Sequence, residues 1–204
     1  MSAPSLAAFG IAALSIVYAI VFLGFVRGHP DAHGAAALAN ACIALSGILV
    51  TVAAAAIGQR IGTESPAGAG TRFGLDAGTW IGLFGVGYGL LSATHGAFAT
   101  ISELGGTTEG GISPTDPRGF ATFGLAGLWM LVLALVAPGA TAGWPGWLTP
   151  VAFIGGIDLV ALFVATVAGA ELPILLTGGL ASVILGPAFW IGAGILLSFA
   201  SGPA

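Results

Sequence analysis

The sequence predicts an all-α protein, a polytopic transmembrane bundle of six helices that forms a single domain over residues 1–204. Three observations lead to this fold class. Charged residues make up only 6% of the chain, against about a quarter in a soluble domain. Hydrophobic residues make up 57%, with a mean hydropathy of +1.06. Six nearly uncharged stretches each match the roughly 20 residues that a helix needs to cross about 30 Å of hydrocarbon.

Segments with helix-breaking or polar residues separate the six predicted spans. Gly28 and Pro30 follow the first span, and a stretch rich in glycine, serine and proline runs from Gly58 to Gly78. The third connection runs from Gly105 to Pro117 and the fourth from Pro138 to Pro145, while the fifth is the shortest. We therefore expect helices over residues 5–26, 36–57, 78–101, 120–138, 148–169 and 174–200.

Prolines mark two helix starts and one bend. Pro117 and Pro173 fall in the first turn of the fourth and sixth spans, where a missing N–H is tolerated. Asp116 precedes Pro117 and can cap the fourth helix, while Arg118 follows it near the membrane interface. Pro187 lies inside the sixth span, so we expect a kink there, compensated by neighbouring helices or side-chain hydroxyls.

Small residues in the third span predict close helix packing. Gly85, Gly89, Ala93 and Ala97 recur every four residues and should form one face. In lipid, helices associate mainly through such close approach, because there is little hydrophobic drive between them. The pattern favours a compact bundle over a wide aqueous pore.

The charge and cysteine content excludes several classes of protein. Four basic residues and a net charge of −4 provide no basic patch, which excludes DNA and RNA as partners. The chain contains no lysine, so it cannot form the Schiff base of a retinal protein. The single cysteine, Cys42, can form no internal disulfide and is expected to be a small buried hydrophobe.

We expect a multi-pass protein of the cell membrane, with the lipid bilayer as its main partner. The amino terminus lacks the positively charged segment of a secretory signal, so the first helix is expected to be retained. The positive-inside rule gives a tie, because Arg60 and Arg72 lie on one side and Arg27 and Arg118 on the other. Most acidic residues lie opposite Arg60 and Arg72, and on this basis we place both termini in the cytoplasm.

A polar stripe in the third span is the first candidate site. Tyr88, Ser92, His95 and Ser102 lie on one helical face, and Asp158 is the acid nearest the middle of any predicted span. A buried Asp or His in lipid usually faces inward and finds a partner, so we expect Asp158 to pair with His95 or with Tyr88. The pair is either a structural hydrogen bond that locks the bundle or a protonatable site in a transport or catalytic path.

The segment HPDAH is the second candidate site. If the second helix begins at Pro30, His29 and His33 are one turn apart and could share a metal ion with Asp31 or with a carboxylate of the third loop. The alternative is that Asp31 sits in the first turn of that helix, where the helix dipole favours it, beside two solvated histidines.

Motifs that would identify a cofactor are missing: the chain contains no nucleotide-binding loop, zinc-protease helix or paired-cysteine signature, so the cofactor is left open. At SPTDPRGFATFGLAGLW and again at ILGPAFWIGAGILL the chain resembles a loose group of small bacterial multi-span membrane proteins of unknown function. The resemblance covers the second half of the chain and implies several spans, but no activity, cofactor or functional residues.

We interpret the chain as a non-enzymatic integral membrane protein, either an accessory or assembly subunit that works with other membrane subunits or a binder of a small apolar ligand between helices. The scarcity of catalytic groups motivates this interpretation. The alternatives are a small transporter that uses Asp158 and His95, and a membrane metalloenzyme that uses His29 and His33.

Overall fold

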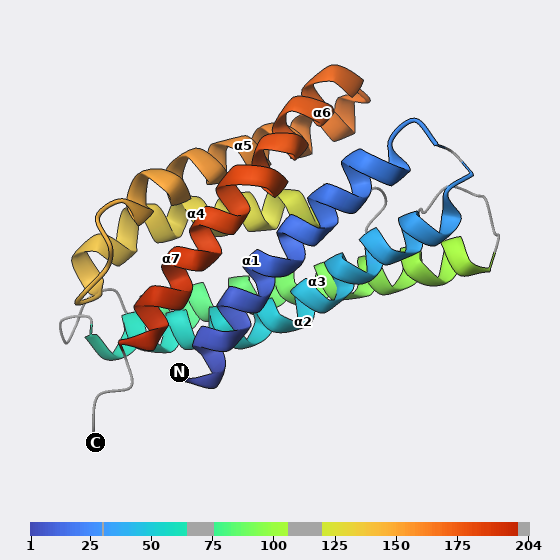
Figure 1. Cartoon of the computed structure of the whole chain (residues 1–204). Coiled ribbons are helices and arrows are strands. Elements are labelled where there is room, and N and C mark those ends of the chain that lie inside the picture. The colour runs from blue at the N-terminus through green and yellow to red at the C-terminus, as the bar shows by residue number, and fades with distance from the viewer. Residues whose placement is uncertain (30, 65–75, 106–119, 200–204) are drawn as a thin grey trace.

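The computed structural model describes residues 1–29, 31–64, 76–105 and 120–199, and in these ranges the protein is an all-α bundle without strands (Figure 1). The first rod is α1 (Ala3–Val21), which continues as a π-helical turn, η1 (Phe22–Val26). Four helices follow, α2 (His33–Glu64), α3 (Ala77–Leu104), α4 (Phe120–Ala140) and α5 (Leu148–Ala168). The last rod consists of α6 (Glu171–Leu180), a second π-helical turn, η3 (Ala181–Leu185), and α7 (Gly186–Ser198). The six predicted helices are confirmed.

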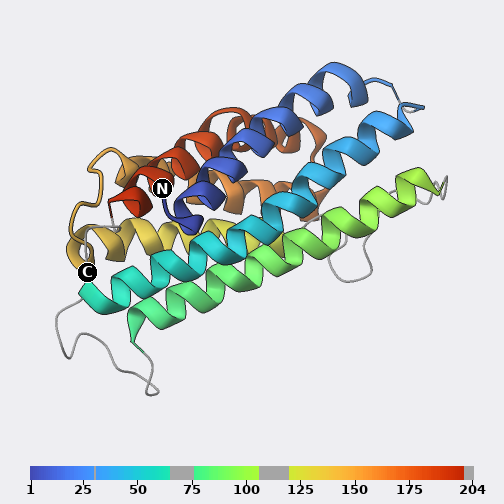
Figure 2. The same ribbon diagram turned by 60° about the horizontal axis from the view of Figure 1, so that its bottom comes forward.

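Five of these helical rods are long and apolar enough to cross a membrane, which is compatible with an integral membrane protein. They cover Ala3–Val26, His33–Glu64, Ala121–Ala140, Leu148–Ala168 and Glu171–Ser198. The predicted third span, α3, is not among the five, although its 28 residues would reach across a bilayer. Its glycines, hydroxyls, His95 and Glu103 lower its hydropathy. Figure 2 shows α3 running antiparallel along α2 for most of its length.

The α2–α3 contact is a seam of small residues with a seven-residue repeat. On α3, Gly78, Gly85, Ser92 and Ala99 form one row of buried residues, and Gly82, Gly89 and Gly96 form the other. A Cβ atom on Gly96 would lie 2.4 Å from the backbone N of Ala44, and one on Gly47 of α2 would lie 2.3 Å from the backbone N of Ala93. The two backbones are therefore in direct contact, as small residues allow in lipid.

The predicted packing stripe of the third span was correct at its start and wrong at its end. Gly85 and Gly89 are buried in the seam, but Ala97 is exposed. A strict four-residue spacing advances 400° per step in a helix of 3.6 residues per turn, so the stripe drifts around the helix. Alternating steps of three and four residues stay on one face, which is why the seam passes through Gly96 instead of Ala97.

The start of α1 and the end of α7 lie together at one end of the bundle (Figure 1). The Ser5 hydroxyl donates to the carbonyl oxygen of Gly194 (3.0 Å) and lies 2.6 Å from the Ser198 hydroxyl. At the same end, the Arg60 guanidinium pairs with Glu64 (2.9 Å) and donates to the carbonyl oxygens of Leu196 and Ala142. The Glu64 carboxylate in turn accepts from the Ala142 N–H (2.6 Å). This cluster ties the end of α2 to the α4–α5 connection and to α7.

The last rod contains two prolines, Pro173 at its start and Pro187 in its interior, and it accommodates them in different ways. Pro173 lies in the first turn of α6, as predicted. Pro187 lies in the first turn of α7, directly after η3, where the Gly186 N–H donates to the Ala181 carbonyl five residues earlier. The helix thus changes its hydrogen-bond register before Pro187, whose ring nitrogen has no hydrogen to donate. Pro30, Asp116, Pro117 and Arg118 lie outside the described residues.

Candidate functional site

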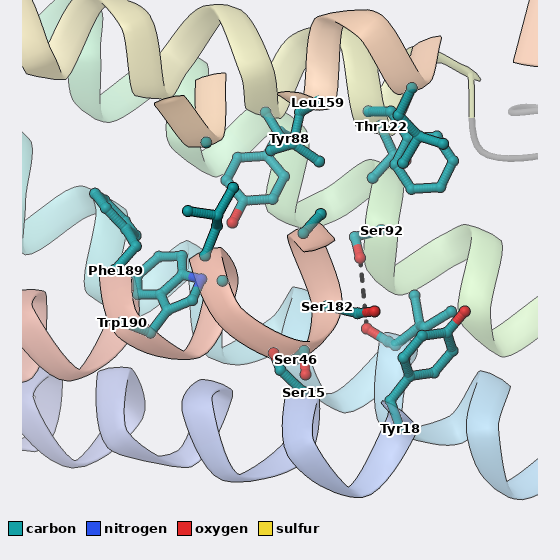
Figure 3. Close-up of a pocket in the computed structure, with 18 of the residues that line it drawn as sticks. Ser15, Tyr18, Ser46, Tyr88, Ser92, Thr122, Leu159, Ser182, Phe189 and Trp190 are labelled. Atoms are coloured by element: carbon teal, nitrogen blue, oxygen red, sulfur yellow. Dashed lines mark hydrogen bonds between the residues drawn. The ribbon is translucent and has the colours of Figure 1, made fainter. Parts of the chain in front are cut away.

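A cavity of about 240 Å³ lies inside the bundle, in the half that carries the ends of α1 and α3 and the start of α4 (Figure 3). All six helical rods contribute to its wall, which is mainly apolar and aromatic with several hydroxyl groups. The lining residues are Leu14, Ser15 and Tyr18 from α1, Cys42, Ile43 and Ser46 from α2, Tyr88, Ser92 and His95 from α3, Thr122, Phe123, Ala126, Trp129 and Met130 from α4, Gly155, Leu159 and Leu162 from α5, and Gly178, Ala181, Ser182, Leu185, Gly186, Phe189 and Trp190 from the last rod.

One side of the cavity is an aromatic wall. The Trp129 ring lies 5.5 Å from that of Tyr88 and stacks on Trp190 at 5.9 Å, and Phe189 meets Trp190 edge-on at 5.2 Å. The Trp129 indole N–H donates to the Ile81 carbonyl oxygen (2.9 Å), which fixes the ring against α3. These contacts hold the rings in place, so the wall is rigid and presents apolar faces.

The other side carries hydroxyl groups, and Figure 3 shows Ser15, Ser46, Ser92 and Ser182 away from the Phe189 and Trp190 rings. Ser15 donates to the Ile11 carbonyl (2.9 Å), Ser182 to that of Gly178 (2.6 Å) and Ser92 to that of Ile43 (3.5 Å). A hydroxyl that donates to a backbone carbonyl keeps its lone pairs as acceptors. The cavity can therefore accept a hydrogen bond from a ligand.

The structure brings together three residues of the predicted polar stripe. Tyr88, Ser92 and His95 all line the cavity, whereas Ser102 does not. The helix face that carries these three residues, which the sequence spacing indicated, therefore faces the cavity.

Asp158 is buried on α5, with 8% of its surface exposed, and is not part of the cavity wall. Its Oδ2 atom has no hydrogen-bond partner among the described residues, so neither His95 nor Tyr88 donates to that atom. Gly155, about one turn before Asp158, lies beside Leu185, and Leu162, about one turn after it, lies beside Gly178. Asp158 therefore lies at the level of η3, between these two contacts. The pairing of Asp158 with His95 or Tyr88 stays a prediction.

The metal prediction for the HPDAH segment assumed that the second helix begins at Pro30, and the structure differs from this assumption. The helix α2 begins at His33, not at Pro30, so His29 does not lie one helical turn below His33. The His33 ring contacts a carboxylate near the third loop, with Nδ1 2.9 Å from Oε2 of Glu103. Among the described ranges, no group of three His, Cys, Asp or Glu side chains is close enough to hold a metal ion. A metal site of His29, His33 and Asp31 stays a prediction.

Sequence reasoning missed the aromatic wall and the hydroxyl of Ser182. The residues of that wall come from α3, α4 and α7, which are distant in the chain, and their hydrophobicity is typical of any span. The one local signal is Gly186 followed by Pro187 after Ser182, because a glycine and a proline inside a span indicate a disturbed helix.

No protein-family model, no curated protein and no solved structure matches this chain.

Proposed function

We propose that this protein is an integral membrane protein that binds a small, uncharged and mostly apolar molecule inside its helical bundle. The observation that carries the proposal is the cavity with an aromatic wall on one side and hydroxyl groups on the other. Of the two roles in our sequence interpretation, an accessory subunit and a ligand binder, the cavity supports the second. We also propose that the Arg60 end of the bundle, where α1 begins and α7 ends, faces the cytoplasm.

The size of the cavity sets the size of the ligand. Engineered cavities of about 150 Å³ lined by apolar side chains bind benzene. In proportion, a volume of 240 Å³ accommodates on the order of ten non-hydrogen atoms. A planar ring with one hydroxyl or amine group fits best, because the ring can stack on Trp129 and Trp190 while its N–H or O–H donates to a serine.

The test uses the full chain in phospholipid nanodiscs with 4-bromophenol as the probe, because its bromine quenches tryptophan fluorescence and its hydroxyl donates a hydrogen bond. We expect a saturable quenching of Trp129 and Trp190. Ala126→Leu fills the cavity and should weaken binding by about tenfold or more, a loss of about 1.4 kcal/mol. The control Ala161→Leu adds the same side chain on the exposed surface of α5 and should bind like the wild type. Quenching that never saturates, or that is equal in the two variants, refutes the proposal.

Proton-coupled transport is the second candidate function, and the unpaired Oδ2 atom of Asp158 is the observation that favours it. A buried carboxyl in a span, with one oxygen that has no hydrogen-bond partner among the described residues, is a candidate for binding and releasing a proton. We expect Asp158→Asn to abolish proton flux into vesicles that hold a pH-sensitive dye, and Asp31→Asn, at an exposed position, to leave the flux intact. Equal flux in the wild type and in Asp158→Asn eliminates this candidate.

A further inference from the structure

On one side, the cavity is bordered by α1 and α6. Neither η1, which continues α1, nor α6 contains a buried residue, whereas each of the other helical segments in the described ranges does. The cavity is lined on the α1 side of this border by Leu14, Ser15 and Tyr18, and on the α6 side by Gly178. In Figure 1, α1 and η1 run toward the same end of the bundle as α6.

The helix contacts show why this side is weakly closed. The helix α1 packs along α7 and reaches η3, but it makes no extended contact with α6. The last rod therefore separates from α1 beyond η3, at the depth where Gly178 and Ser182 face the cavity. Over the described residues, α1 and α6 therefore form no extended helix–helix interface beside the cavity.

In the proposed membrane protein, the medium outside this border is lipid. Both segments belong to rods that are apolar enough to span the membrane, Ala3–Val26 and Glu171–Ser198. The same two helices also expose apolar side chains, with Val17 41% and Ile20 60% exposed on α1 and Leu176 62% exposed on α6. Water has no favourable contact with such a surface, whereas acyl chains do.

We propose that the ligand reaches the cavity sideways from the bilayer, between α1 and α6, and is therefore an uncharged amphipathic molecule dissolved in the membrane. This inference rests on the proposed ligand binding. Such a molecule keeps its apolar body in an apolar medium throughout, and its polar group finds the serine hydroxyls only inside the cavity. A charged solute would lose its hydration along this path at a large cost in free energy.

The single cysteine provides a probe for access that needs no engineering. Cys42 lines the cavity and is 96% buried, and no other thiol exists in the chain. N-ethylmaleimide is uncharged and dissolves in lipid, so it should alkylate Cys42 in proteoliposomes of phosphatidylcholine. The charged reagent sulfonatoethyl methanethiosulfonate should not react from either side, and 4-bromophenol should slow the alkylation by occupying the cavity.

Two adjacent glycines of α6 supply a matched pair of variants. A Cβ atom on Gly178 would lie 3.8 Å from Leu162 of α5, which also lines the cavity, whereas one on Gly179 would meet nothing within 4 Å. Gly178→Phe should slow the alkylation of Cys42 by about tenfold or more, which corresponds to about 1.4 kcal/mol of added barrier. Gly179→Phe should react at the wild-type rate.

The outcomes separate this inference from the proposed function and from misfolding. Equal alkylation rates in the two variants, no alkylation of the wild type, or reaction with the charged reagent each overturn the sideways path, while saturable binding of 4-bromophenol would still support the cavity as a ligand site. A variant that fails to fold exposes Cys42 and reacts faster, which is the opposite of the expected change. Gly178→Leu, with a smaller side chain, then replaces Gly178→Phe.

Discussion

Replacing Gly96 by alanine should separate the two longest helices of the bundle. The new Cβ atom would lie 2.4 Å from the Ala44 backbone N and 2.7 Å from the Asn40 carbonyl oxygen, where ordinary contacts begin at 3.4 Å. Both neighbours are backbone atoms of α2 and cannot rotate away. The two helices must therefore move apart by about 1 Å at this point, which also loosens the neighbouring small-residue contacts of the seam.

The free energy of unfolding should fall by about 1–2 kcal/mol in Gly96→Ala. Overpacking of a tight contact costs about 1–3 kcal/mol, and the higher helix propensity of alanine returns up to about 1 kcal/mol. The control is Gly87→Ala on the same helix, where the nearest atom, Cδ2 of Leu125, lies at an ordinary 3.7 Å. Only the propensity gain applies there, so the control should be as stable as the wild type or more stable.

The changes in the free energy of unfolding can be compared by unfolding both variants in dodecyl maltoside micelles with increasing sodium dodecyl sulfate. The loss of helical circular dichroism follows the unfolding. If Gly96→Ala proves as stable as Gly87→Ala, the close backbone contact at the seam does not hold α2 and α3 together.

Three further predictions concern the ends and the cavity. Arg60→Met should lower the free energy of unfolding by about 2 kcal/mol, because it removes the hydrogen bonds to Glu64 and to two backbone carbonyls. In the same detergent assay, Arg60→Lys should recover only part of this loss, since an ammonium cannot reach all three acceptors. The Thr79 backbone N–H and hydroxyl hold the pKa of Asp76 below its usual value, so the cap of α3 contributes fully above the unfolded-state pKa and is lost as the pH falls through the folded-state pKa. Thermal unfolding between neutral and acidic pH should therefore change less in Asp76→Asn than in the wild type, and identical profiles contradict this. Gly186→Ala would place a Cβ atom 2.7 Å from the Ala181 carbonyl oxygen, so it should disturb η3 and weaken 4-bromophenol binding by about tenfold, whereas Gly179→Ala should not.

The positions of the helices were predictable because they depend on local composition. The spans expected at 78–101, 120–138 and 148–169 differ by at most three residues at either end from α3, α4 and α5. The second span was expected to end at residue 57, but α2 continues to Glu64. Gly58 looks like a breaker in the sequence, yet it is the point where α2 contacts Gly78 and Gly82 of α3. Local propensity favours a loop at this glycine, whereas in the structure it allows close helix packing and the helix continues through it.

The candidate site was predictable only where its residues share one helix. Tyr88, Ser92 and His95 were found because steps of three and four residues place them on one face, and the cavity lies on that face. Trp129 and Trp190 are more than sixty positions apart in the chain, and no local pattern indicates that their rings stack. Asp158 was recognised as an unusual residue from its place in an apolar span, but its register against η3 depends on how α5 packs.

Composition alone predicted helices that are long and apolar enough to cross a membrane, because backbone groups in hydrocarbon must be satisfied within the same segment. The tertiary structure decided which helix faces meet, since in a uniformly apolar helix hydrophobicity does not distinguish an inward face from a lipid-facing one. That choice depends on the shapes of the surfaces in contact. The small residues of α2 and α3 close one side of the bundle, and the bulky rings of Trp129, Phe189 and Trp190 leave a cavity beside them.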